Sequence, residues 1–316
     1  NSLKSGETQS FNVEYVLDIP FAFSRGGYDD PLYKFTQWYP KPAVFDNEGW
    51  HPMPYLAYGE YFAEFGNYEV EITVPIAFSL AHTGVLDGDK TVLNLEDRKR
   101  TAFITATKVH DFAWFADKRY HVLKGEIELP HSKRKVTTWA MFTPKNAYLW
   151  DEIALESLKD GTYWYSKWNG DYPYNNVTAV DGTISAGGGM EYPTITVIGN
   201  TSSKIQLETV IVHEVGHNWF YGILGSNERV HPWLDEGLNT ANEIRYMETK
   251  YPNNGFFSDN FGGIDKALHI SGISHHHGSD LMYNLMAGEG KDQPIETHSN
   301  DLTPTNYGAI AYAKTG

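Results

Sequence analysis

Two histidines near the middle of the chain have the spacing of metal ligands. The segment reads His213-Glu214-Val215-Gly216-His217. On an α-helix, a separation of four residues leaves the two imidazoles roughly 40° apart around the axis and about 6 Å apart along it, so both can reach one ion. The pattern H-E-x-x-H on a helix is typical of zinc hydrolases, in which the glutamate, here Glu214, is the general base.

A third ligand and a supporting glutamate follow on the next predicted helix. Glu236 comes 18 residues after the second histidine, not counting either end, and can supply a carboxylate. Three protein ligands with a fourth position left for water are typical of a catalytic zinc centre rather than a structural one. Glu243 is seven residues beyond Glu236 and therefore on the same helix face. It is either an exposed glutamate or a group that orients a ligating histidine through its other ring nitrogen.

The sequence also predicts the elements that must position these residues. Ser203-Lys204-Ile205-Gln206 has the form of a capping box, and the apolar residues after it give one buried face, which predicts a helix over 202–221. A second helix is predicted over 233–250 and a third over 146–166. Strands are predicted from apolar stretches that end at turn residues, at 68–75, 101–107, 136–142 and 194–198.

Three further stretches are open to two interpretations each. The stretch 185–193 contains three consecutive glycines, which would let backbone approach a ligand; we expect a flexible loop, and Glu191 in it is either solvated or functional. The aromatic and proline-rich stretch 37–62 is an irregular packed part of a β-sheet domain or a stacking platform. The three histidines at 275–277 cannot all face one ion on regular structure, so we expect a polar loop there rather than a second metal site.

Composition excludes several classes of protein. The 316 residues carry a net charge of −15, which argues against nucleic acid or an anionic membrane as the main partner, because both need a basic face. The chain contains no cysteine, so disulfides, thiolate metal sites and thiol catalysis are excluded. No apolar run approaches the ~20 residues of a transmembrane segment. The acidic, cysteine-free composition, rich in tyrosine and asparagine, leads us to expect an extracytoplasmic location, periplasmic or secreted.

The combined motifs resemble those of the M1 family of zinc aminopeptidases, gluzincins related to aminopeptidase N and leukotriene A4 hydrolase. Besides the H-E-x-x-H segment and Glu236, the resemblance includes Gly188-Gly189-Met190-Glu191 upstream and 307–316 downstream, in the family's order and near its spacing. It implies an α+β fold. A β-rich, saddle-like N-terminal domain would occupy residues 1–118, and a thermolysin-like catalytic domain residues 119–316.

The resemblance also implies a role for each matching residue. His213, His217 and Glu236 would bind one Zn²⁺ per chain, and Glu214 would activate the water. Glu191 would bind the free α-amino group of a peptide substrate, within a substrate-binding segment formed by Gly188, Gly189 and Met190. Tyr312 would stabilise the oxyanion, Tyr307 would be a second tyrosine at the substrate, and Glu243 would support the metal site from outside the ligand set.

Two departures from the family pattern bear on these roles. Tyr192 stands where the family motif has asparagine, directly after Glu191, which affects the backbone around the amine-binding carboxylate. The chain ends at Gly316, within the motif that contains Tyr312, whereas family members continue into a helical domain. We therefore expect this chain to be a piece of a longer protein.

The function predicted from the sequence is a zinc-dependent aminopeptidase that removes N-terminal residues from peptides. One alternative is another zinc hydrolase on the same scaffold, such as an endopeptidase or an epoxide hydrolase, and Tyr192 keeps it open. A second alternative is a non-catalytic binding protein that retains the metal site. The preferred N-terminal residue and the oligomeric state do not follow from the sequence.

Overall fold

The first part of the chain forms antiparallel sheets. The computed structural model describes residues 3–22, 24–55, 59–182, 184, 188–252, 269 and 272–316. The described elements up to residue 117 are all strands: β1 (Gly27–Asp29), β2 (Leu32–Phe35), β3 (Val44–Asp46), β4 (Gly49–His51), β5 (Gly66–Pro75), β6 (Ser79–His82), β7 (Val85–Asn94), β8 (Lys99–Val109) and β9 (Trp114–Asp117). They build a four-stranded sheet of order β1-β2-β9-β6, a three-stranded sheet of order β5-β8-β7 and the hairpin β3-β4.

The predicted strands at 68–75 and 101–107 are confirmed. They lie within β5 and β8, which pair antiparallel from Gly66 with Val109 to Pro75 with Lys99. The aromatic stretch 37–62 contains only the short hairpin β3-β4 as regular structure among its described residues, as the irregular-segment interpretation expects.

A mixed five-stranded sheet forms the centre of the second part of the chain. Its order is β10-β11-β12-β14-β13, with β10 (His121–Glu128), β11 (Lys135–Phe142), β12 (Asn176–Asp181), β13 (Gly189–Tyr192) and β14 (Ile195–Ile198). The middle strands β11, β12 and β14 run parallel, and both edges are antiparallel. Every residue of β12 and β14 is buried, because other elements cover both faces of the sheet.

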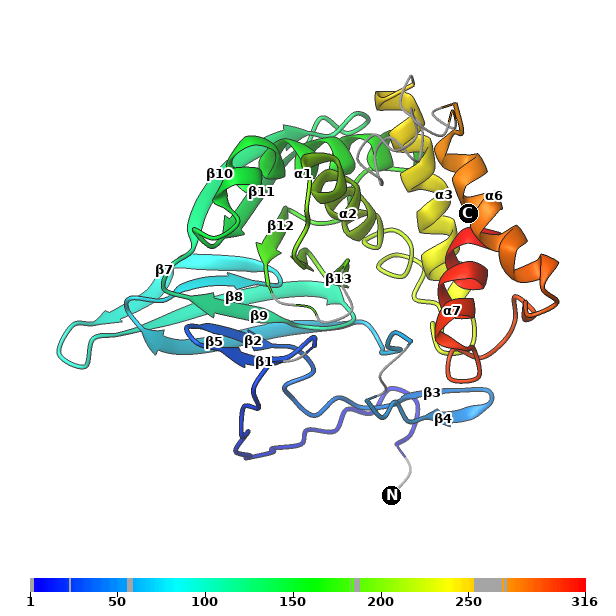
Figure 1. Cartoon of the computed structure of the whole chain (residues 1–316). Coiled ribbons are helices and arrows are strands. Elements are labelled where there is room, and N and C mark those ends of the chain that lie inside the picture. Colours follow the sequence, from blue (N-terminus) through cyan, green and yellow to red (C-terminus); the bar gives the residue numbers. More distant parts are fainter. Residues whose placement is uncertain are drawn as a thin grey trace.

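Helices cover one face of the mixed sheet and the N-terminal strands cover the other (Figure 1). Helices α1 (Ala147–Asn169) and α2 (Lys204–Gly216) share a core with Ala140, Ala179 and Ile198 of the sheet. On the opposite face, Met141 and Val180 pack with Phe115 of β9. The alternation follows from the two-residue period of strands. The edge strand β13 lies against the last turn of α2, at Glu214.

The remaining helices lie beyond the edge of the mixed sheet. They are α3 (Pro232–Lys250), α6 (His275–Gly288), the short α7 (Pro304–Asn306) and the π-helix η1 (Tyr307–Lys314). Helix η1 packs against α3 so closely that a Cβ on Gly237 would lie 2.6 Å from the carbonyl oxygen of Ala311. The chain end is therefore held directly against the helix that carries Glu236.

Several predicted helices and strands are confirmed, while two predicted loops are wrong. The helices predicted over 146–166 and 233–250 correspond to α1 and α3, and the strands over 136–142 and 194–198 to β11 and β14. The predicted flexible loop is wrong for Gly189–Tyr192, which form β13; residues 185–187 lie outside the described part. The predicted polar loop at 275–277 is wrong as well, because Ser274 caps α6 and the histidines form its first turn.

The passage between the two parts of the chain lies between β9 and β10, where residues 118 and 119 form a turn. Strands before this turn belong to the N-terminal sheets, and strands after it belong to the mixed sheet. The predicted domain boundary at residues 118 and 119 falls in this turn and stays a prediction.

Candidate functional site

Helix α2 presents both histidines of the H-E-x-x-H segment. Ser203 caps the helix, and its Oγ accepts a hydrogen bond from the backbone N–H of Gln206 at 3.2 Å. The other half of the predicted capping box is shifted by one residue, since Gln206 Oε1 accepts from Ser202 N at 2.8 Å. The helix ends at Gly216, so the predicted end at 221 is wrong. His217 is the C-cap but keeps helical dihedral angles, φ −63° and ψ −12°, which leaves both imidazoles on one face.

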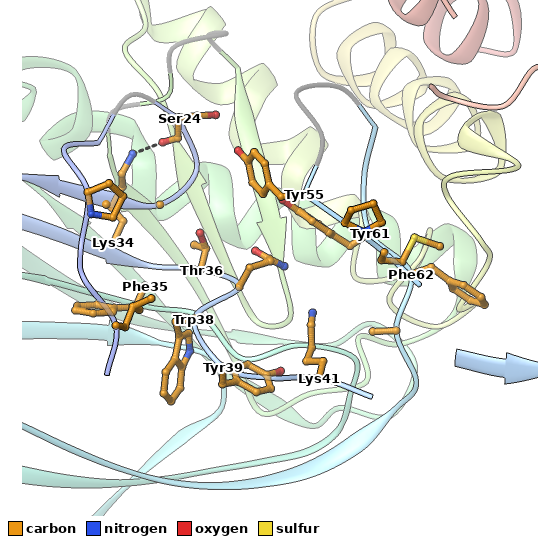
Figure 2. Close-up of a pocket in the computed structure, with 18 of the residues that line it drawn as sticks. Ser24, Lys34, Phe35, Thr36, Trp38, Tyr39, Lys41, Tyr55, Tyr61 and Phe62 are labelled. Carbon is orange, nitrogen blue, oxygen red and sulfur yellow. Dashed lines mark hydrogen bonds between the residues drawn. The ribbon is translucent and has the colours of Figure 1, made fainter. Parts of the chain in front are cut away.

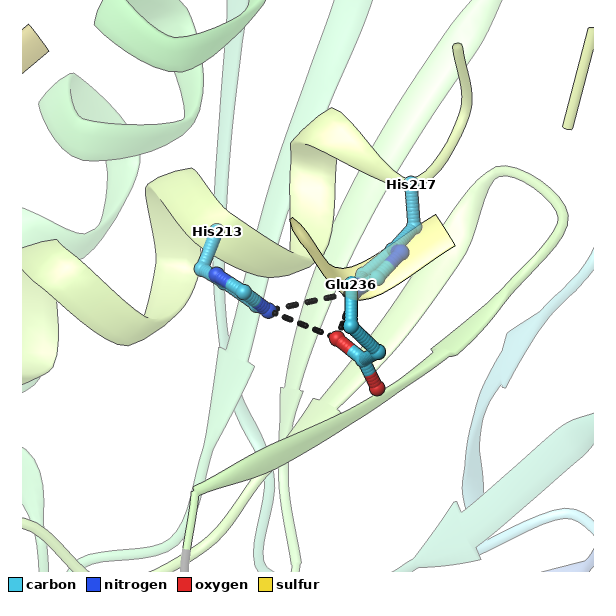
Figure 3. Close-up of side chains that lie close together, drawn as sticks. All are labelled: His213, His217 and Glu236. Atoms are coloured by element: carbon cyan, nitrogen blue, oxygen red, sulfur yellow. Dashed lines mark hydrogen bonds and ion pairs between the residues drawn. The ribbon is translucent and has the colours of Figure 1, made fainter. Parts of the chain in front are cut away.

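The ligand atoms of His213, His217 and Glu236 converge as the sequence predicts (Figure 3). His213 Nε2 lies 3.2 Å from His217 Nε2, and Glu236 Oε2 lies 3.3 Å from both of these nitrogens. Ligands of a tetrahedral zinc ion, with bonds of about 2.0–2.2 Å, are roughly 3.3–3.5 Å apart. The three atoms therefore fit the donor types and the spacing of a zinc site.

Carboxylates hold the other ring nitrogen of each histidine. Glu243 Oε2 lies 2.8 Å from His213 Nδ1, and Asp235 Oδ1 lies 2.5 Å from His217 Nδ1. When Nδ1 donates its proton to a carboxylate, the lone pair of a neutral imidazole is on Nε2, which is the atom that faces the other ligands. Glu243 thus lies where the sequence places it, outside the ligand set and against the far nitrogen of His213. Asp235 was not predicted from the sequence, although a carboxylate directly before the proposed ligand Glu236, in the first turn of a helix, was a usable signal.

The carboxylates of the site favour the protonated form of its histidines. Burial by itself lowers the pKa of His213, but its hydrogen bonds to Glu236 and Glu243 outweigh burial and raise the pKa to about 10. Burial raises the pKa of Glu236, yet the neighbouring charge of His217 and the hydrogen bonds from both imidazoles lower it below its ordinary value. Carboxylates that raise the pKa of buried histidines indicate a place where a cation is stabilised.

Close packing behind α2 fixes the orientation of the H-E-x-x-H segment. Asn239 of α3 donates a hydrogen bond from Nδ2 to the carbonyl oxygen of His213 at 2.7 Å, and its Oδ1 accepts from Tyr165 Oη at 3.0 Å. A Cβ on Gly216 would lie 1.9 Å from Asn239 Oδ1 and 2.3 Å from Tyr165 Cε1. Only glycine therefore fits at this position of the motif.

The edge strand β13 lies against Glu214. A Cβ on Gly189 would lie 2.5 Å from Glu214 Cγ and 2.6 Å from its Oε1, so the missing side chain leaves room for the carboxylate. Glu214 Oε2 has no hydrogen-bond partner among the described residues. Burial raises the pKa of Glu214 to about 7, against the lowering effect of the His213 and His217 charges. A buried carboxyl with a free oxygen and a pKa near neutrality is suited to exchange protons.

Strand alternation separates Glu191 from its neighbours in sequence. Met190 and Tyr192 are 4% and 3% exposed and pack in the core shared with the N-terminal strands. Tyr192 Oη donates to Gln37 Oε1 at 3.4 Å. Glu191 points the other way, and its carboxylate belongs to a group with His217 and Asp235 whose potential ligand atoms lie within 4.8 Å of one another. Tyr192, which stands where the family motif has asparagine, thus contributes to the interface with the N-terminal strands.

Two further glutamates, which the sequence analysis missed, lie beside Glu191. The carboxylate oxygens of Glu60, Glu191 and Glu228 include a set within 4.8 Å of one another. Glu60 is paired with Arg25 at 3.1 Å. Glu60 comes from the N-terminal part and Glu228 from the connection between α2 and α3, so no local pattern in the sequence links them.

Both tyrosines of the C-terminal stretch reach the site. Tyr312 Oη donates a short hydrogen bond to Glu236 Oε1, and its ring is stacked on His213 at 5.9 Å between centroids. Tyr307 is buried, its ring lies 6.0 Å from that of Tyr312, and its hydroxyl has no hydrogen-bond partner among the described residues. They belong to a π-helix, an uncommon conformation often found at functional sites.

A separate cavity of about 930 Å³ lies in the N-terminal part (Figure 2). Its lining includes the aromatic residues Phe35, Trp38, Tyr39, Tyr55, Tyr61 and Phe62. Tyr61 also lines a small space that contains Glu191 and Glu228. Tyr61, in the aromatic stretch 37–62, thus borders both the cavity and these two carboxylates.

Comparison with known proteins supports the fold. No family model matches the sequence, and no curated protein matches it. Among solved structures, a glutamate-to-alanine variant of the M1 zinc metallopeptidase from Deinococcus radiodurans is similar with a TM-score of 0.60 at 15% identity, over 92% of this chain and 58% of that one. The same type of variant bound to a Tyr-Ser-Ala substrate has a TM-score of 0.58 at 15% identity, over 90% and 56%. Legionella pneumophila aminopeptidase A in complex with aspartic acid has a TM-score of 0.61 at 16% identity, over 93% and 32%.

The chain therefore has the fold of M1 zinc metallopeptidases. The predicted α+β class is confirmed, with a β-rich first part followed by a second part that has the fold of the neighbours' catalytic domain. It spans less than two thirds of the length of these neighbours. At identities of this size, the structural similarity establishes the fold, and the activity of this chain is left to be proposed. No helix in the described part of the chain is long and apolar enough to cross a membrane.

Proposed function

We propose that this protein is a zinc-dependent aminopeptidase that removes N-terminal residues from peptides. The observation that carries the proposal is the convergence of His213 Nε2, His217 Nε2 and Glu236 Oε2 at 3.2 and 3.3 Å, next to a buried Glu214 with one free oxygen. The fold shared with zinc metallopeptidases supports it. An extracytoplasmic location stays a prediction based on composition.

The residues of the site have distinct roles in the proposed reaction. When bound, zinc supplies a Lewis acid that polarises the scissile carbonyl and lowers the pKa of an attacking water. Glu214 accepts the proton of that water on its carboxylate and then donates it to the leaving amine. Tyr312, whose hydroxyl donates to Glu236 in this structure, donates instead to the oxyanion that develops on the carbonyl. Asp235 and Glu243 keep both imidazoles oriented.

Glu191 determines where the peptide is cut in this proposal. Its carboxylate lies in one group with His217 and Asp235, so an α-ammonium bound to it is held one residue away from the carbonyl at the metal. Burial raises the pKa of Glu191 well above its ordinary value, and a bound ammonium restores the charged form by a direct ion pair. An aminopeptidase needs such a fixed distance between the amine and the reacting carbonyl.

The test compares zinc-loaded protein on three substrates: L-leucine 4-nitroanilide, its N-acetyl derivative and an internally quenched peptide with blocked ends. We expect hydrolysis of the free-amine substrate alone, and loss of that hydrolysis on chelation with recovery on addition of zinc. Cleavage of the blocked peptide instead would identify an endopeptidase. Absence of hydrolysis despite one bound zinc per chain would favour a binding protein or another hydrolase and contradict the proposal.

The general base has its own test. Glu214→Gln preserves the size of the side chain and removes its ability to accept the proton, so hydrolysis should fall by at least the ~100-fold that positioned acid–base groups contribute. The zinc content should remain one per chain, since Glu214 is not in the ligand set. Activity retained by Glu214→Gln would show that another group is the base.

A further inference from the structure

A groove between the two parts of the chain is separate from the candidate metal site. Its volume is about 550 Å³, which is within the size range of small-molecule sites. Strands β6, β7 and β8 line it from the N-terminal part, and β10, β11 and β12 line it from the mixed sheet (Figure 1). In the described part of the chain, the candidate metal ligands, the proposed base and both C-terminal tyrosines are absent from its lining.

The face of β11 that is turned toward the N-terminal sheets changes along the strand from core to groove. Met141, near the end of the strand, packs in one core with Ala81 of β6. Trp139 is on the same face, because strand side chains alternate, and it lines the groove. Leu86 of β7 and Val122 of β10 border the groove and are each 44% exposed. Large apolar side chains that stay exposed around a groove indicate a ligand with an apolar body.

The charged groups of the groove are all positive. Arg100 of β8 and Lys124 of β10 line it, and no aspartate or glutamate does so among the described residues. The whole chain has 40 acidic and 25 basic residues, so composition alone would favour carboxylates here. His82 lines the groove as well, but burial and the charge of Arg100 lower the pKa of His82 to about 4, so its imidazole is neutral at pH 7. The groove therefore carries two positive charges at neutral pH.

Arg100 and Lys124 make contacts that leave their charges unbalanced. Arg100 donates from Nη2 to the carbonyl oxygen of Phe78 at 2.7 Å, which is a neutral acceptor. Its Nε has no hydrogen-bond partner within the part of the chain that the structure describes, and burial lowers its pKa. Lys124 Nζ lies over the ring of Trp139, 4.8 Å from the centroid. Both cations are thus placed for an anionic partner.

Other lysines on the neighbouring strands are paired with carboxylates. Lys90 of β7 lies 3.3 Å from Asp87, and Lys135 of β11 lies 3.1 Å from Glu126 of β10. Neither carboxylate belongs to the described lining of the groove. The negative charges closest in sequence to the groove are therefore engaged elsewhere.

We propose that this groove binds a small molecule with an apolar body and an anionic oxygen group, a carboxylate or a phosphate, which Arg100 and Lys124 bind together. Guanidinium and ammonium groups form charge-assisted hydrogen bonds with such oxygens. The apolar body packs on Trp139 and Leu86. The site lies outside the metal centre and goes beyond the proposed peptidase function, and no bond is made or broken in it.

Two fluorescent probes test the requirement for charge. 8-Anilinonaphthalene-1-sulfonate carries an anionic oxygen group, and N-phenyl-1-naphthylamine has the same rings without it. We expect the zinc-loaded protein to bind the sulfonate more tightly, with an affinity that falls as the salt concentration rises. In Arg100→Gln and in Lys124→Gln, the dissociation constant of the sulfonate should rise about 10-fold, the lower end of the range for a lost charge-assisted hydrogen bond. The dissociation constant of the neutral probe should stay unchanged.

A matched variant and a set of competitors locate the site and identify the anion. Lys99→Gln removes the same charge from the residue next to Arg100 on β8, which is exposed and not part of the described lining, and it should bind both probes like the wild type. Lys124 is exposed, so Lys124→Gln remains a test if Arg100→Gln is unstable. We expect 2-naphthoate or 2-naphthyl phosphate to displace the sulfonate, the better competitor identifying the anion, and 2-naphthalenemethanol to displace it far less.

Three outcomes would overturn the proposal. The first is an equal affinity for the charged and the neutral probe, and the second is an unchanged affinity for the sulfonate in both groove variants. The third is an equal loss of affinity in Lys99→Gln, which would show an effect of net charge and not of a defined site. A loss in either groove variant that Lys99→Gln does not share would support the proposal.

Discussion

Asp235 and Glu236, neighbours in sequence, lie against opposite nitrogens of the same imidazole. Asp235 Oδ1 is 2.5 Å from His217 Nδ1, and Glu236 Oε2 is 3.3 Å from His217 Nε2. The first turn of α3 therefore supplies both a proposed metal ligand and the group that orients another one. Because one rigid turn does both, the separation between the two carboxylates is set by helix geometry.

Replacement of Asp235 should weaken metal binding without removing a ligand. Asp235→Asn keeps the size of the side chain but loses the charge that holds the Nδ1 proton of His217, and loss of such partners typically costs 10–100-fold in affinity. Competition with a chromogenic chelator measures the zinc dissociation constant. Asp280→Asn, at an exposed position of α6, is the matched control and should bind zinc like the wild type. An unchanged affinity in Asp235→Asn would contradict the orienting role.

A methyl group on β13 should displace the proposed base. Gly189→Ala would bring a Cβ within 2.6 Å of the Glu214 carboxylate, so the side chain of Glu214 must move out of position. We expect kcat to fall by about 100-fold or more, in the range for a lost general base, while zinc content stays at one per chain. Gly288→Ala is the control, since a Cβ there has nothing within 4 Å. Normal kcat in Gly189→Ala would show that Glu214 is not held by this strand.

The hydroxyl of Tyr312 should matter for turnover more than for metal binding. Tyr312→Phe removes one donor to the developing oxyanion, a loss that costs about 100–1,000-fold in kcat, with the KM for L-leucine 4-nitroanilide changed far less. Tyr283→Phe removes a tyrosine hydroxyl that is 3.3 Å from Asp292 in the same region and should leave kcat unchanged. If both variants lose activity equally, the effect comes from packing at the chain end.

The acid limb of the pH profile should report the protonation of Glu214. A general base must be deprotonated before it acts, so kcat/KM falls as the pH drops through its pKa. Burial raises this pKa from 4.5 to about 7, and a cation at the ligands acts in the opposite direction, so the limb is expected between these values. A pH titration of kcat/KM from 4 to 9 measures it. An acid limb well above 7 would assign the ionisation to another group.

The same pKa shift predicts a stability effect in the metal-free protein. A carboxyl with a folded-state pKa raised from 4.5 to about 7 binds more protons in the folded than in the unfolded state between these pH values, so its contribution to stability is lost as the pH rises through this window. Glu214→Gln should therefore be more stable than the wild type at pH 8 by roughly 1–3 kcal/mol, and the difference should vanish near pH 4.5. Urea unfolding at both pH values gives the two free energies. A variant less stable at pH 8 would contradict the buried, charged state of Glu214.

Local geometry made much of the candidate metal site predictable. His213 and His217 are placed by four residues of helix, and Glu236 and Glu243 by seven residues of another, so their relative directions follow from the helical repeat. The end of helix α2 was nevertheless predicted five residues too late, because the chain from 217 to 221 forms turns, with Trp219 and Phe220 packed into the core, and not a regular helix.

The strand β13 shows where local patterns fail. Its glycines predict a loop, yet Gly189–Tyr192 pair with Ile195–Ile198, because backbone hydrogen bonds to the neighbouring strand outweigh the weak strand preference of glycine. Pairing then decides that Glu191 faces the site while Tyr192 faces the N-terminal sheet, since adjacent strand residues point to opposite faces.

The sequence by itself determined the two histidines and the glutamate between them, because their relative directions depend on spacings within one helix. The carboxylate on the following helix and the class of fold followed from the order and spacing of motifs that resemble those of the M1 family. Only the tertiary structure decided that Glu60, Glu191 and Glu228 share one small space. These three residues come from the N-terminal part, the edge of the mixed sheet and the connection between α2 and α3, and their meeting depends on how the sheets pack, which is a long-range property that no local spacing encodes.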